Sequence, residues 1–367
     1  EDSNEQVDKW IIDSNFVYKE IKDIILGRNI SDLSSYIEAD RSGRKRALNK
    51  NQKTIIWEIW QNIELQLEAE DFSLEAQAYI DLMDSPKVEY DFVFIDEAQD
   101  FYPTAISMVL NKCKSPDNCF ISIDPNQSLF RSPFKWKDVK HNGEPINFTG
   151  KTTILKQNHR TTQQIWSAAL KLIISSDDND TDTSIDAGFP KRTGDLPIIA
   201  DFDLDDQVRY LETWIHTNMV KESVTLSACV VLVPTKLVGE LFENRIRKKF
   251  NPKFYNSPAL AKNLDHKGLL ITTFDAAKGF GWPLTIVAGL GSIQYDKQID
   301  YKSNGIGFPF PLELYRDYDH IRHLYTALTR AGNSLLILNN KSYPCEYLDP
   351  IRDYVDVPPD NWYQDLQ

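Results

Sequence analysis

The stretch "YDFVFIDEAQD", Tyr90–Asp100, decides the fold class of this chain. Its run of aromatic and β-branched residues predicts a buried strand, and the acidic residues that follow mark the carboxyl end of that strand. Ligands of α/β sheets bind at this end. Asp96 there suits Mg²⁺, which prefers hard oxygen ligands, and Glu97 suits a water molecule that must be oriented or deprotonated. Taken alone, such a pair is more often a charge pair at a helix N-terminus.

Strand-like and helix-like patterns alternate along the rest of the chain. Apolar runs such as "CFISI", "ACVVLV", "GLLITT", "LTIVAGL" and "SLLILN" are separated by amphipathic stretches such as "TTQQIWSAALKLII". This alternation predicts parallel sheets covered by helices. The residues before Tyr90 are helical in pattern. We therefore predict an α/β fold with a helical segment over 1–85, an α/β region over 86–150 and a second over 151–367.

Length and composition define the class of protein. A chain of 367 residues with 41% hydrophobic content is long enough for two or three domains. No apolar run approaches the roughly 18 residues of a membrane span, and the start lacks the pattern of a signal peptide, so we expect a cytoplasmic protein. The four cysteines are scattered without a CxxC pair, which argues against a zinc site or a disulfide framework.

The net charge of −13 argues against a nucleic-acid partner only as an average over the whole chain, because phosphate binding needs only a local basic surface. Two basic runs are present, one containing Arg44, Lys45 and Arg46, the other being "RIRKKF", 245–250. We expect both runs to face single-stranded DNA. The alternative is that they are merely solvated, as charge runs often are.

The string "GKTT", 150–153, matches the end of a phosphate-binding Walker A loop. Such a loop joins a strand to a helix, so that backbone N–H groups and the helix N-terminus surround the phosphates. Here Pro145 stands where the pattern requires glycine, and a β-like run follows Lys151 instead of a helix. The sequence favours a turn into a strand over a phosphate site.

Further strand and helix ends carry polar residues. "CFISIDPNQSLFR" delivers Asp124 and Gln127 after a strand, "LKQNHRTTQQI" delivers Arg160 before a helix, and "HLYTALTRAGNSLLIL" ends its helix with Arg330. Each has a structural explanation as well. Arg330 can complement a helix C-terminus, and Gln127 can cap a turn.

Together with "DEAQD" and "AAKGFGWP", these segments resemble motifs II to VI of superfamily 1 helicases of the UvrD/Rep branch, over most of 90–339. The resemblance implies two RecA-like parallel-sheet motor domains, the first incomplete, and the N-terminal helices are similar to the 1B insertion of the first domain. The chain between Arg160 and the later "GLLITT" strand is too short for an inserted 2B domain of about 100–200 residues.

The resemblance also implies roles for individual residues. Asp96 would ligate Mg²⁺ and Glu97 would activate water, while Arg160 and Arg330 would act as arginine fingers that stabilise charge during phosphoryl transfer from ATP. Gln99 and Gln127 would couple the γ-phosphate to the nucleic-acid site. The other implied contacts are His159, Lys278 and Gly279 at the nucleotide, and Phe130, Trp136 and Thr273 at the nucleic acid. For Trp136, core packing is the favoured alternative.

Two positions depart from the family pattern. Asp275 stands where the family has histidine, which places a carboxylate near the expected path of a DNA phosphate, an unfavourable arrangement unless it is screened. Gly281 stands where the family has glutamate, which removes an implied ribose contact.

No Walker A loop precedes Tyr90, so we expect the chain to be the C-terminal part of a longer helicase. Its expected partners are single-stranded DNA, the N-terminal ATP-binding portion of the same protein and a partner nuclease, and its expected polarity is 3′-to-5′ by resemblance. Alone it should hydrolyse almost no ATP. One alternative is a non-hydrolysing nucleic-acid-binding or regulatory subunit. Another is a metal-dependent nuclease that uses Asp96, Glu97 and Asp100.

Overall fold

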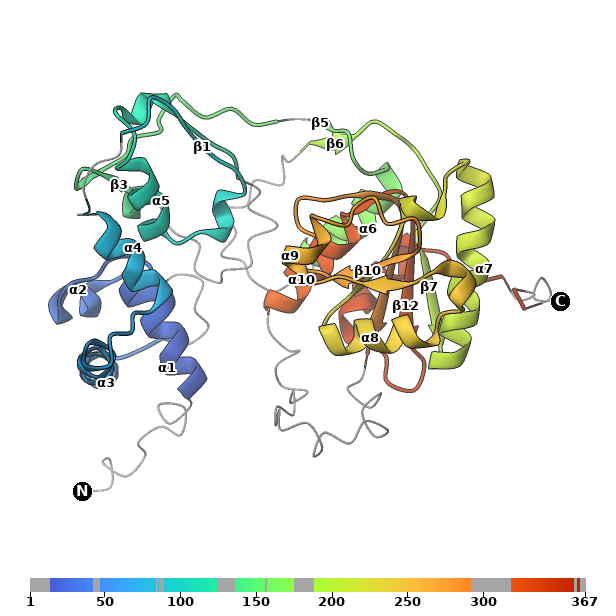
Figure 1. The fold of residues 1–367 in the computed structure, drawn as a ribbon, viewed down its shortest axis with the longest axis horizontal. Coiled ribbons are helices and arrows are strands. Elements are labelled where there is room, and N and C mark those ends of the chain that lie inside the picture. The colour runs from blue at the N-terminus through green and yellow to red at the C-terminus, as the bar shows by residue number, and fades with distance from the viewer. Residues whose placement is uncertain are drawn as a thin grey trace, which may run out of the picture. The chain divides into compact units, whose positions relative to one another are not determined.

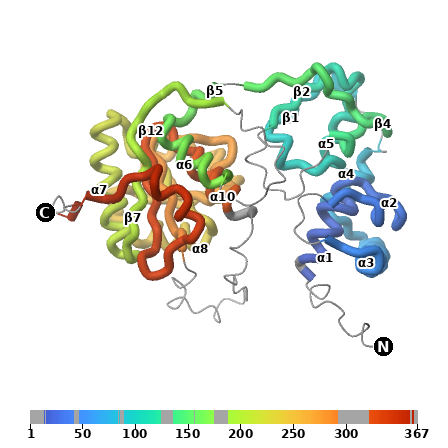
Figure 2. The backbone as a smooth tube through the Cα atoms, turned by 180° about the vertical axis from the view of Figure 1, so that it is seen from behind, coloured from blue at the N-terminus to red at the C-terminus, as the bar shows by residue number. Residues whose placement is uncertain are grey.

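The computed structural model describes residues 14–41, 47–83, 85, 89–123, 136–155, 157–174, 188–291, 318–359 and 362–363. The chain divides into two compact units, unit 1 from Glu1 to Thr153 and unit 2 from Ile154 to Gln367. Figure 1 labels their elements in chain order, and Figure 2 follows the backbone from behind.

The first part of unit 1 is helical. Helix α3 begins with a capping box, in which the Asn49 side chain accepts from the backbone N–H of Gln52 and the Gln52 side chain accepts from that of Asn49. Asp32 caps α2 in a similar way, by accepting from Ser35 at 2.9 Å. The helical elements are α1 (Ser14–Glu20), which continues as a π-helical turn (Ile21–Leu26), α2 (Leu33–Glu38), α3 (Lys50–Ala69) and α4 (Glu75–Met83).

The second part of unit 1 contains a parallel pair of strands. Val93, Phe94 and Ile95 of β1 lie opposite Cys119, Phe120 and Ile121 of β2. One face of this pair, with Val93 and Ile95, packs with Ile106 and Leu110 of α5. A hairpin follows, and its turn, Asn142-Gly143, has positive φ at both residues, as a tight two-residue turn requires. The elements are β1 (Val93–Ile95), a 3₁₀ turn (Ala98–Asp100), α5 (Pro103–Leu110), a 3₁₀ turn (Pro116–Asn118), β2 (Cys119–Ile121), a 3₁₀ turn (Trp136–Asp138), β3 (Lys140–His141) and β4 (Glu144–Pro145).

The helical part and the strand pair form one unit because α5 contacts both. The Tyr102 hydroxyl donates to Asp23 at 3.3 Å, and the backbone N–H of Thr104 donates to the Gly27 carbonyl at 3.2 Å. Tyr102 and Ala105 also belong to the hydrophobic cluster of the N-terminal helices.

In the described residues, unit 2 holds a six-stranded sheet in the order β7-β12-β11-β8-β10-β9. Every neighbouring pair in it is parallel. The predicted α/β class is thereby confirmed. The elements are β5 (Gln157–Asn158), α6 (Gln163–Ile174), β6 (Phe189–Pro190), β7 (Ile198–Phe202), α7 (Leu204–Glu222), a 3₁₀ turn (Leu226–Ala228), β8 (Cys229–Val233), α8 (Lys236–Arg245), a 3₁₀ turn (Lys248–Phe250), β9 (Lys253–Phe254), α9 (Ser257–Leu260), β10 (Leu270–Thr273), β11 (Trp282–Leu290), α10 (Tyr318–Leu328), β12 (Ala331–Asn340) and a 3₁₀ helix (Glu346–Tyr354).

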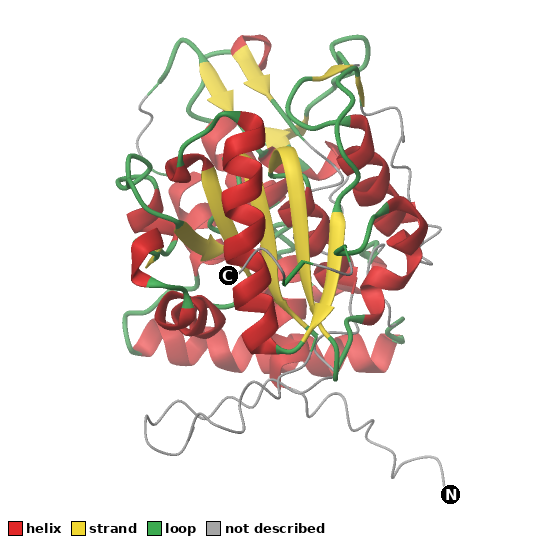
Figure 3. Ribbon diagram, turned by 90° about the vertical axis from the view of Figure 1, so that its right-hand side faces the viewer, coloured by secondary structure: helices red, strands yellow, loops and turns green. Residues whose placement is uncertain are grey.

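Both faces of this sheet are buried, because successive strand residues point to opposite sides. Along β8, Val230 and Leu232 join a core with α6, α10 and the C-terminal 3₁₀ helix, whereas Val231 and Val233 join a core with α7 and α8. Figure 3 shows a long helix crossing in front of the strands. Burial on both faces explains why these strands read as continuous apolar runs.

The predicted strand over "TTILK" does not form where it was expected. Residues 151–155 have no regular structure, and Ile154 and Leu155 are exposed, at 51% and 82%. The segment spans the junction of the two units, where no described strand pairs with it, and an apolar run without a ladder partner gains little from extension. Among the described helices, none has the length and apolar character needed to cross a membrane.

Candidate functional site

The acidic pair lies at the carboxyl end of β1 in unit 1, as predicted. Oδ1 of Asp96 accepts a hydrogen bond from the backbone N–H of Glu97 at 3.0 Å and another from the hydroxyl of Ser122. Ser122 directly follows the neighbouring strand β2, so the parallel pair delivers both side chains to one edge. Asp96 is exposed and its carboxylate is oriented by two donors. This arrangement fits a Mg²⁺ ion, which keeps several waters and needs few protein ligands.

Glu97 has an unusual backbone conformation, with φ 52° and ψ 42°. A non-glycine residue in this left-handed region costs about 1 kcal/mol or more, and such residues concentrate at functional sites. Nε2 of the buried Gln99 donates to Oε2 of Glu97 at 2.5 Å. Glu97 precedes the 3₁₀ turn Ala98–Asp100 but makes no side-chain cap hydrogen bond to it. The carboxylate is thus oriented by Gln99 rather than used as a helix cap, which suits a general base.

Several predicted site residues lie outside the described residues: Gln127, Phe130, Arg44, Lys45 and Arg46. Within the described ranges, no group of three or more His, Cys, Asp or Glu side chains is arranged to hold a metal ion. The Mg²⁺ ligand role of Asp96 remains a prediction.

Trp136 is half-buried in unit 1. Its ring centroid lies 4.6 Å from that of Phe148, and it packs against the cluster that contains Val139 and Ile106. This is the packing alternative that the sequence favoured for Trp136. The Lys151 side chain forms an ion pair with Asp117.

In unit 2 the side chain of Arg160 and the backbone carbonyl of Arg330 both lie close to Gly281. A Cβ atom placed on Gly281 would be 3.4 Å from Cδ of Arg160 and 3.5 Å from the carbonyl oxygen of Arg330. Arg160 is exposed, and Oδ1 of Asn158 fixes its turn by accepting from the backbone N–H groups of Arg160 and Thr161, at 2.8 and 3.3 Å. The turn before α6 and the start of β12 therefore meet at Gly281.

Arg330 is fully buried, unlike Arg160. Its Nε donates to the Thr326 carbonyl at 3.0 Å and its Nη1 donates to the Phe280 carbonyl at 3.2 Å. Charge-assisted hydrogen bonds of this kind offset the cost of burying a guanidinium group. In this conformation Arg330 ties the end of α10 to the segment before β11. To act as an arginine finger, its side chain would have to leave these carbonyls.

Three residues for which the resemblance implies a nucleotide or nucleic-acid contact, Thr273, Lys278 and Gly279, lie at the end of β10 or between β10 and β11. Thr273 ends β10, and its hydroxyl accepts from the backbone N–H of Ala276 at 3.2 Å. Lys278 is half-buried, and the exposed Gly279 has a φ of +78°, which suits glycine. His159, in the Arg160 turn, is exposed.

Asp275 in the same segment has a histidine partner. Nε2 of His323, on α10, lies 3.2 Å from Oδ1 of Asp275. A protonated imidazole there would neutralise the carboxylate that departs from the family pattern. Unit 2 thus contains a side chain, His323, that is close enough to screen the Asp275 carboxylate.

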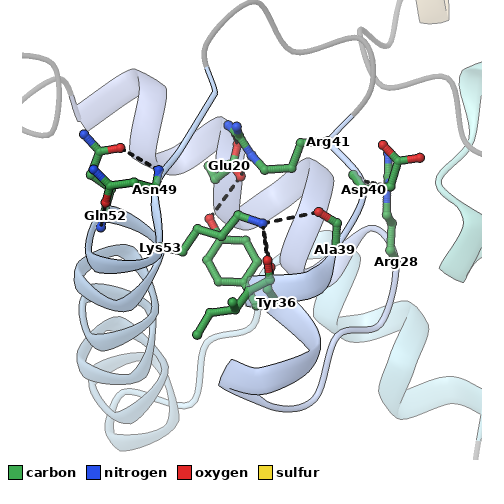
Figure 4. Close-up of polar contacts among 10 residues, drawn as sticks. Glu20, Arg28, Tyr36, Ala39, Asp40, Arg41, Asn49, Gln52 and Lys53 are labelled. Atoms are coloured by element: carbon green, nitrogen blue, oxygen red, sulfur yellow. Dashed lines mark hydrogen bonds and ion pairs between the residues drawn. The ribbon is translucent and has the colours of Figure 1, made fainter.

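Two basic residues that flank Arg44, Lys45 and Arg46 in the sequence, Arg41 and Lys53, have structural roles, shown in Figure 4. Nζ of the buried Lys53 donates to the carbonyls of Tyr36 and Ile37, at 3.0 and 2.7 Å. Burial, with the nearby positive charge of Arg41, lowers the pKa of Lys53. Arg41 in turn pairs with the buried Glu20, with Nε 2.6 Å from Oε1. Both basic residues hold the end of α2 in place.

In the second basic run, two arginines contact α7. Arg245 lies 3.0 Å from Asp205, and Arg247 forms an ion pair with the buried Glu212, whose Oε1 also accepts from the Arg247 backbone N–H at 2.8 Å. Lys249 lies over the ring of Phe250. Much of this run is therefore engaged in intramolecular contacts.

Sequence reasoning missed Ser122, His323 and Arg192. Ser122 lies inside the run "CFISI" that the sequence predicted as a strand, whereas the strand observed ends at Ile121, so the rule that found Asp96 pointed past it. His323 and Arg192 act through contacts with residues far away in the chain, for which the sequence carries no local signal. Arg192 donates from Nη2 to the Arg160 carbonyl at 2.8 Å.

No protein-family model matches the sequence, and no curated protein matches it. Several solved structures align with it at low identity. The C-terminal domain of a possible DNA helicase from Lactobacillus plantarum WCFS1 is 15% identical, with a TM-score of 0.39, over 55% of this chain and 98% of that chain.

The C-terminal domain of the DEAD-box protein Dbp5 is 13% identical, with a TM-score of 0.31, over 46% of this chain and 93% of that chain. A variant of S. cerevisiae Dbp5 bound to RNA and ADP–BeF3 is 13% identical, with a TM-score of 0.37, over 75% and 61%. All three structures align with this chain at low identity and with TM-scores below 0.4.

Proposed function

We propose that this chain carries the water-activating and arginine-bearing parts of an ATP-dependent DNA helicase or translocase, of the superfamily 1 UvrD/Rep branch. In this proposal ATP and Mg²⁺ are the cofactors, and the enzyme moves along single-stranded DNA. The phosphate-binding loop is supplied by a polypeptide outside this sequence, the N-terminal ATP-binding portion of the same protein.

The observation that carries the proposal is the geometry of Glu97. Its left-handed backbone and the hydrogen bond from Gln99 fix a carboxylate beside Asp96 at a strand end. Glu97 would take the proton of the attacking water, and Gln99 would hold Glu97 in position. Bound MgATP would supply the phosphoryl group. Asp96 would position the metal through oxygen, with Ser122 orienting Asp96.

The exposure of Arg160 in unit 2 supports the same proposal. Its side chain lies beside Gly281 and is open to solvent, so its guanidinium is available to a phosphate. An arginine placed beside a transferring phosphoryl group in this way raises kcat about 10³–10⁵-fold in the enzymes where it has been measured.

Among the described residues of unit 1, none covers the second face of the β1–β2 pair, which supports the presence of an additional polypeptide. Phe92, Phe94 and Phe120 point to the face opposite α5 and are exposed, at 65%, 76% and 61%. Parallel strands are normally covered on both faces, since their connections place helices there. Asp96 follows the same face of β1, so a covering segment would also reach the acidic pair. We assign this face to the portion that carries the phosphate-binding loop.

A second candidate function is a non-hydrolysing regulatory subunit that binds nucleic acid through a degenerate motor. Two observations favour it. Arg330 is bonded to carbonyls of its own unit rather than exposed, and Asp275 adds a negative charge where the family has histidine. This alternative predicts nucleic-acid binding without nucleotide turnover.

Steady-state ATP hydrolysis separates the two functions. The product of the complete coding sequence is measured with and without single-stranded DNA, beside the 367-residue chain alone and the Glu97→Gln variant. We expect DNA-stimulated hydrolysis by the complete product, its loss in Glu97→Gln, and negligible hydrolysis by the 367-residue chain.

Binding of DNA without hydrolysis by the complete product would favour the regulatory subunit. Robust hydrolysis by the 367-residue chain, lost in Glu97→Gln, would disprove the external phosphate loop. DNA cleavage with Mg²⁺ and no nucleotide would instead support the nuclease that uses Asp96, Glu97 and Asp100.

A further inference from the structure

Arg192, which no motif includes, contacts the backbone of the Arg160 turn in unit 2. Its Nη2 donates to the carbonyl of Arg160 at 2.8 Å and to that of Gly332 at 2.5 Å. Its Nη1 donates to Oδ1 of Asn333 at 3.1 Å. One guanidinium group therefore joins the turn before α6 to the start of β12. Lysine, with a single ammonium, lacks this planar array of donors.

The backbone around Arg192 holds the same turn from its other side. The Arg192 carbonyl accepts from the N–H of Gln163 at 2.8 Å, and the N–H of Gly194 donates to the Gln164 side chain at 2.8 Å. Just upstream, β5 and β6 pair in parallel, with Gln157 opposite Phe189. The segment 189–194 thus contacts the chain before, at and after Arg160.

The acceptor side chain of this array is itself fixed. Nδ2 of Asn333 donates to Oε2 of Glu222, the last residue of α7, at 2.7 Å. Arg192 is thereby connected through Asn333 to a helix whose apolar side is buried against the sheet. The resulting chain of contacts runs from α7 through Asn333 and Arg192 to the Arg160 carbonyl.

We infer that Arg192 is a positioning residue for Arg160 in the proposed hydrolysis reaction. The inference rests on the proposed function, since it concerns the arginine that reaches the phosphate. Arg160 is exposed, so the direction of its side chain depends on the backbone of its turn. Arg192 fixes the carbonyl of that turn. Rate is sensitive to such placement, and an error of about 1 Å can cost about 100-fold.

The test is a double-variant cycle on the product of the complete coding sequence. Arg192→Ala should lower kcat for DNA-stimulated ATP hydrolysis about 10-fold and leave KM for ATP within about twofold, because binding is retained while alignment is lost. Arg192→Lys should recover part of the loss. Arg160→Ala combined with Arg192→Ala should be no slower than Arg160→Ala alone, since Arg192 acts through Arg160.

The matched control is Arg209→Ala, which removes an exposed arginine that pairs with Asp206 on α7. It should leave kcat and KM unchanged. Losses that add in the double variant, or a change confined to KM, would overturn the positioning role. If Arg160→Ala itself hydrolyses ATP normally, the proposed function fails instead.

Hydrogen exchange keeps the inference testable if the complete product does not hydrolyse ATP. In the 367-residue chain, Arg192→Ala should speed exchange of the Arg160, Thr161 and Gln163 amides about 10-fold or more, because their turn loses its clamp. Arg209→Ala should not. Unchanged exchange in Arg192→Ala would show that the turn is fixed without Arg192.

Discussion

The side-chain amide of Gln99 donates a hydrogen bond of 2.5 Å to Oε2 of Glu97 at the carboxyl end of β1. Gln99 is buried, whereas the Asp96 carboxylate beside it is exposed. The geometry separates two tasks, with one carboxylate open to ligands and the other held in a fixed direction.

Replacing Gln99 by alanine should lower kcat for ATP hydrolysis by the complete product about 10-fold, because Glu97 then samples several orientations. Glu97→Gln, which removes the base, should lower kcat about 100-fold or more. KM for ATP should change little in either variant. Gln77→Ala, at a half-buried glutamine on α4 whose side chain donates to Asp81, is the control. A Gln99→Ala enzyme with normal kcat would contradict the orienting role.

Stability of unit 2 should depend on pH through Asp201. Burial raises the pKa of this carboxyl, but hydrogen bonds from Arg352 and Asn339 outweigh that effect and hold the pKa below its ordinary value. Arg352 contacts both carboxylate oxygens, at 2.6 and 3.0 Å, and so ties the C-terminal 3₁₀ helix to β7.

A carboxyl with a lowered folded-state pKa stabilises the protein above its unfolded pKa, about 3.9, and loses that contribution as pH falls through the folded pKa. Asp201→Asn should therefore be less stable at pH 7 by about 1 kcal/mol, a value reduced by partial solvent exposure. Chemical denaturation at several pH values should show the difference shrinking below about pH 4. Asp206→Asn, at an exposed pair, is the control. A stability difference between Asp201→Asn and the unchanged protein that does not vary with pH would show that the Asp201 carboxylate is not its cause.

Substitution by alanine should lower the stability of unit 2 at Gly289 but not at Gly281. Gly289 in β11 has a φ of +73°, and a Cβ there would lie 2.4 Å from Cγ1 of Val238 on α8. Gly289→Ala should cost about 2–4 kcal/mol of unfolding free energy, from strain and overpacking together. At Gly281 the nearest atom to an added Cβ is 3.4 Å away, so Gly281→Ala should stay within about 0.5 kcal/mol. Equal losses would contradict the packing described.

The exposed face with Phe92, Phe94 and Phe120 allows a test of whether an additional polypeptide covers it. Phe94→Ser should change the stability of the 367-residue chain by less than about 0.5 kcal/mol, because Phe94 is 76% exposed. In the complete product, where the face is covered in our proposal, the same change should cost about 2 kcal/mol. Phe72→Ser, at a phenylalanine 66% exposed after α3, should be neutral in both proteins. Neutrality of Phe94→Ser in the complete product would reject this docking face.

Removing the charge of Asp275 should strengthen nucleic-acid binding if the segment after β10 faces DNA. Asp275→Asn should tighten binding of single-stranded DNA several-fold, because the variant has no carboxylate to repel the DNA phosphates. Fluorescence anisotropy with a labelled single strand measures the dissociation constant. Unchanged binding by Asp275→Asn would show that this segment does not face DNA.

Local patterns were sufficient for most of the strands that the structure describes and for the acidic pair, but not for "TTILK", which forms no strand in the described residues 152–155. The runs "ACVVLV" and "SLLILN" became β8 and the core of β12 because strands buried on both faces must be apolar throughout. The run "YDFVFI" became β1, which is buried on one face, where Val93 and Ile95 lie. Asp96 and Glu97 were recognisable because the carboxyl end of a strand is fixed by the chain itself. The order β7-β12-β11-β8-β10-β9 was not predictable, since each of these apolar runs pairs equally well with several others.

By itself, the sequence determined the α/β class and the position of Asp96 and Glu97 at a strand end, both of which follow from residue type and position within one element. The roles of Arg160 and Arg330 were implied only by the family resemblance. Tertiary structure alone decided that Arg330 is buried against the Phe280 carbonyl while Arg160 is exposed across Gly281, and that His323 meets Asp275. The physical reason is that burial and pairing depend on which distant segments meet. Side-chain chemistry allows many such partners, and packing of the whole unit selects one.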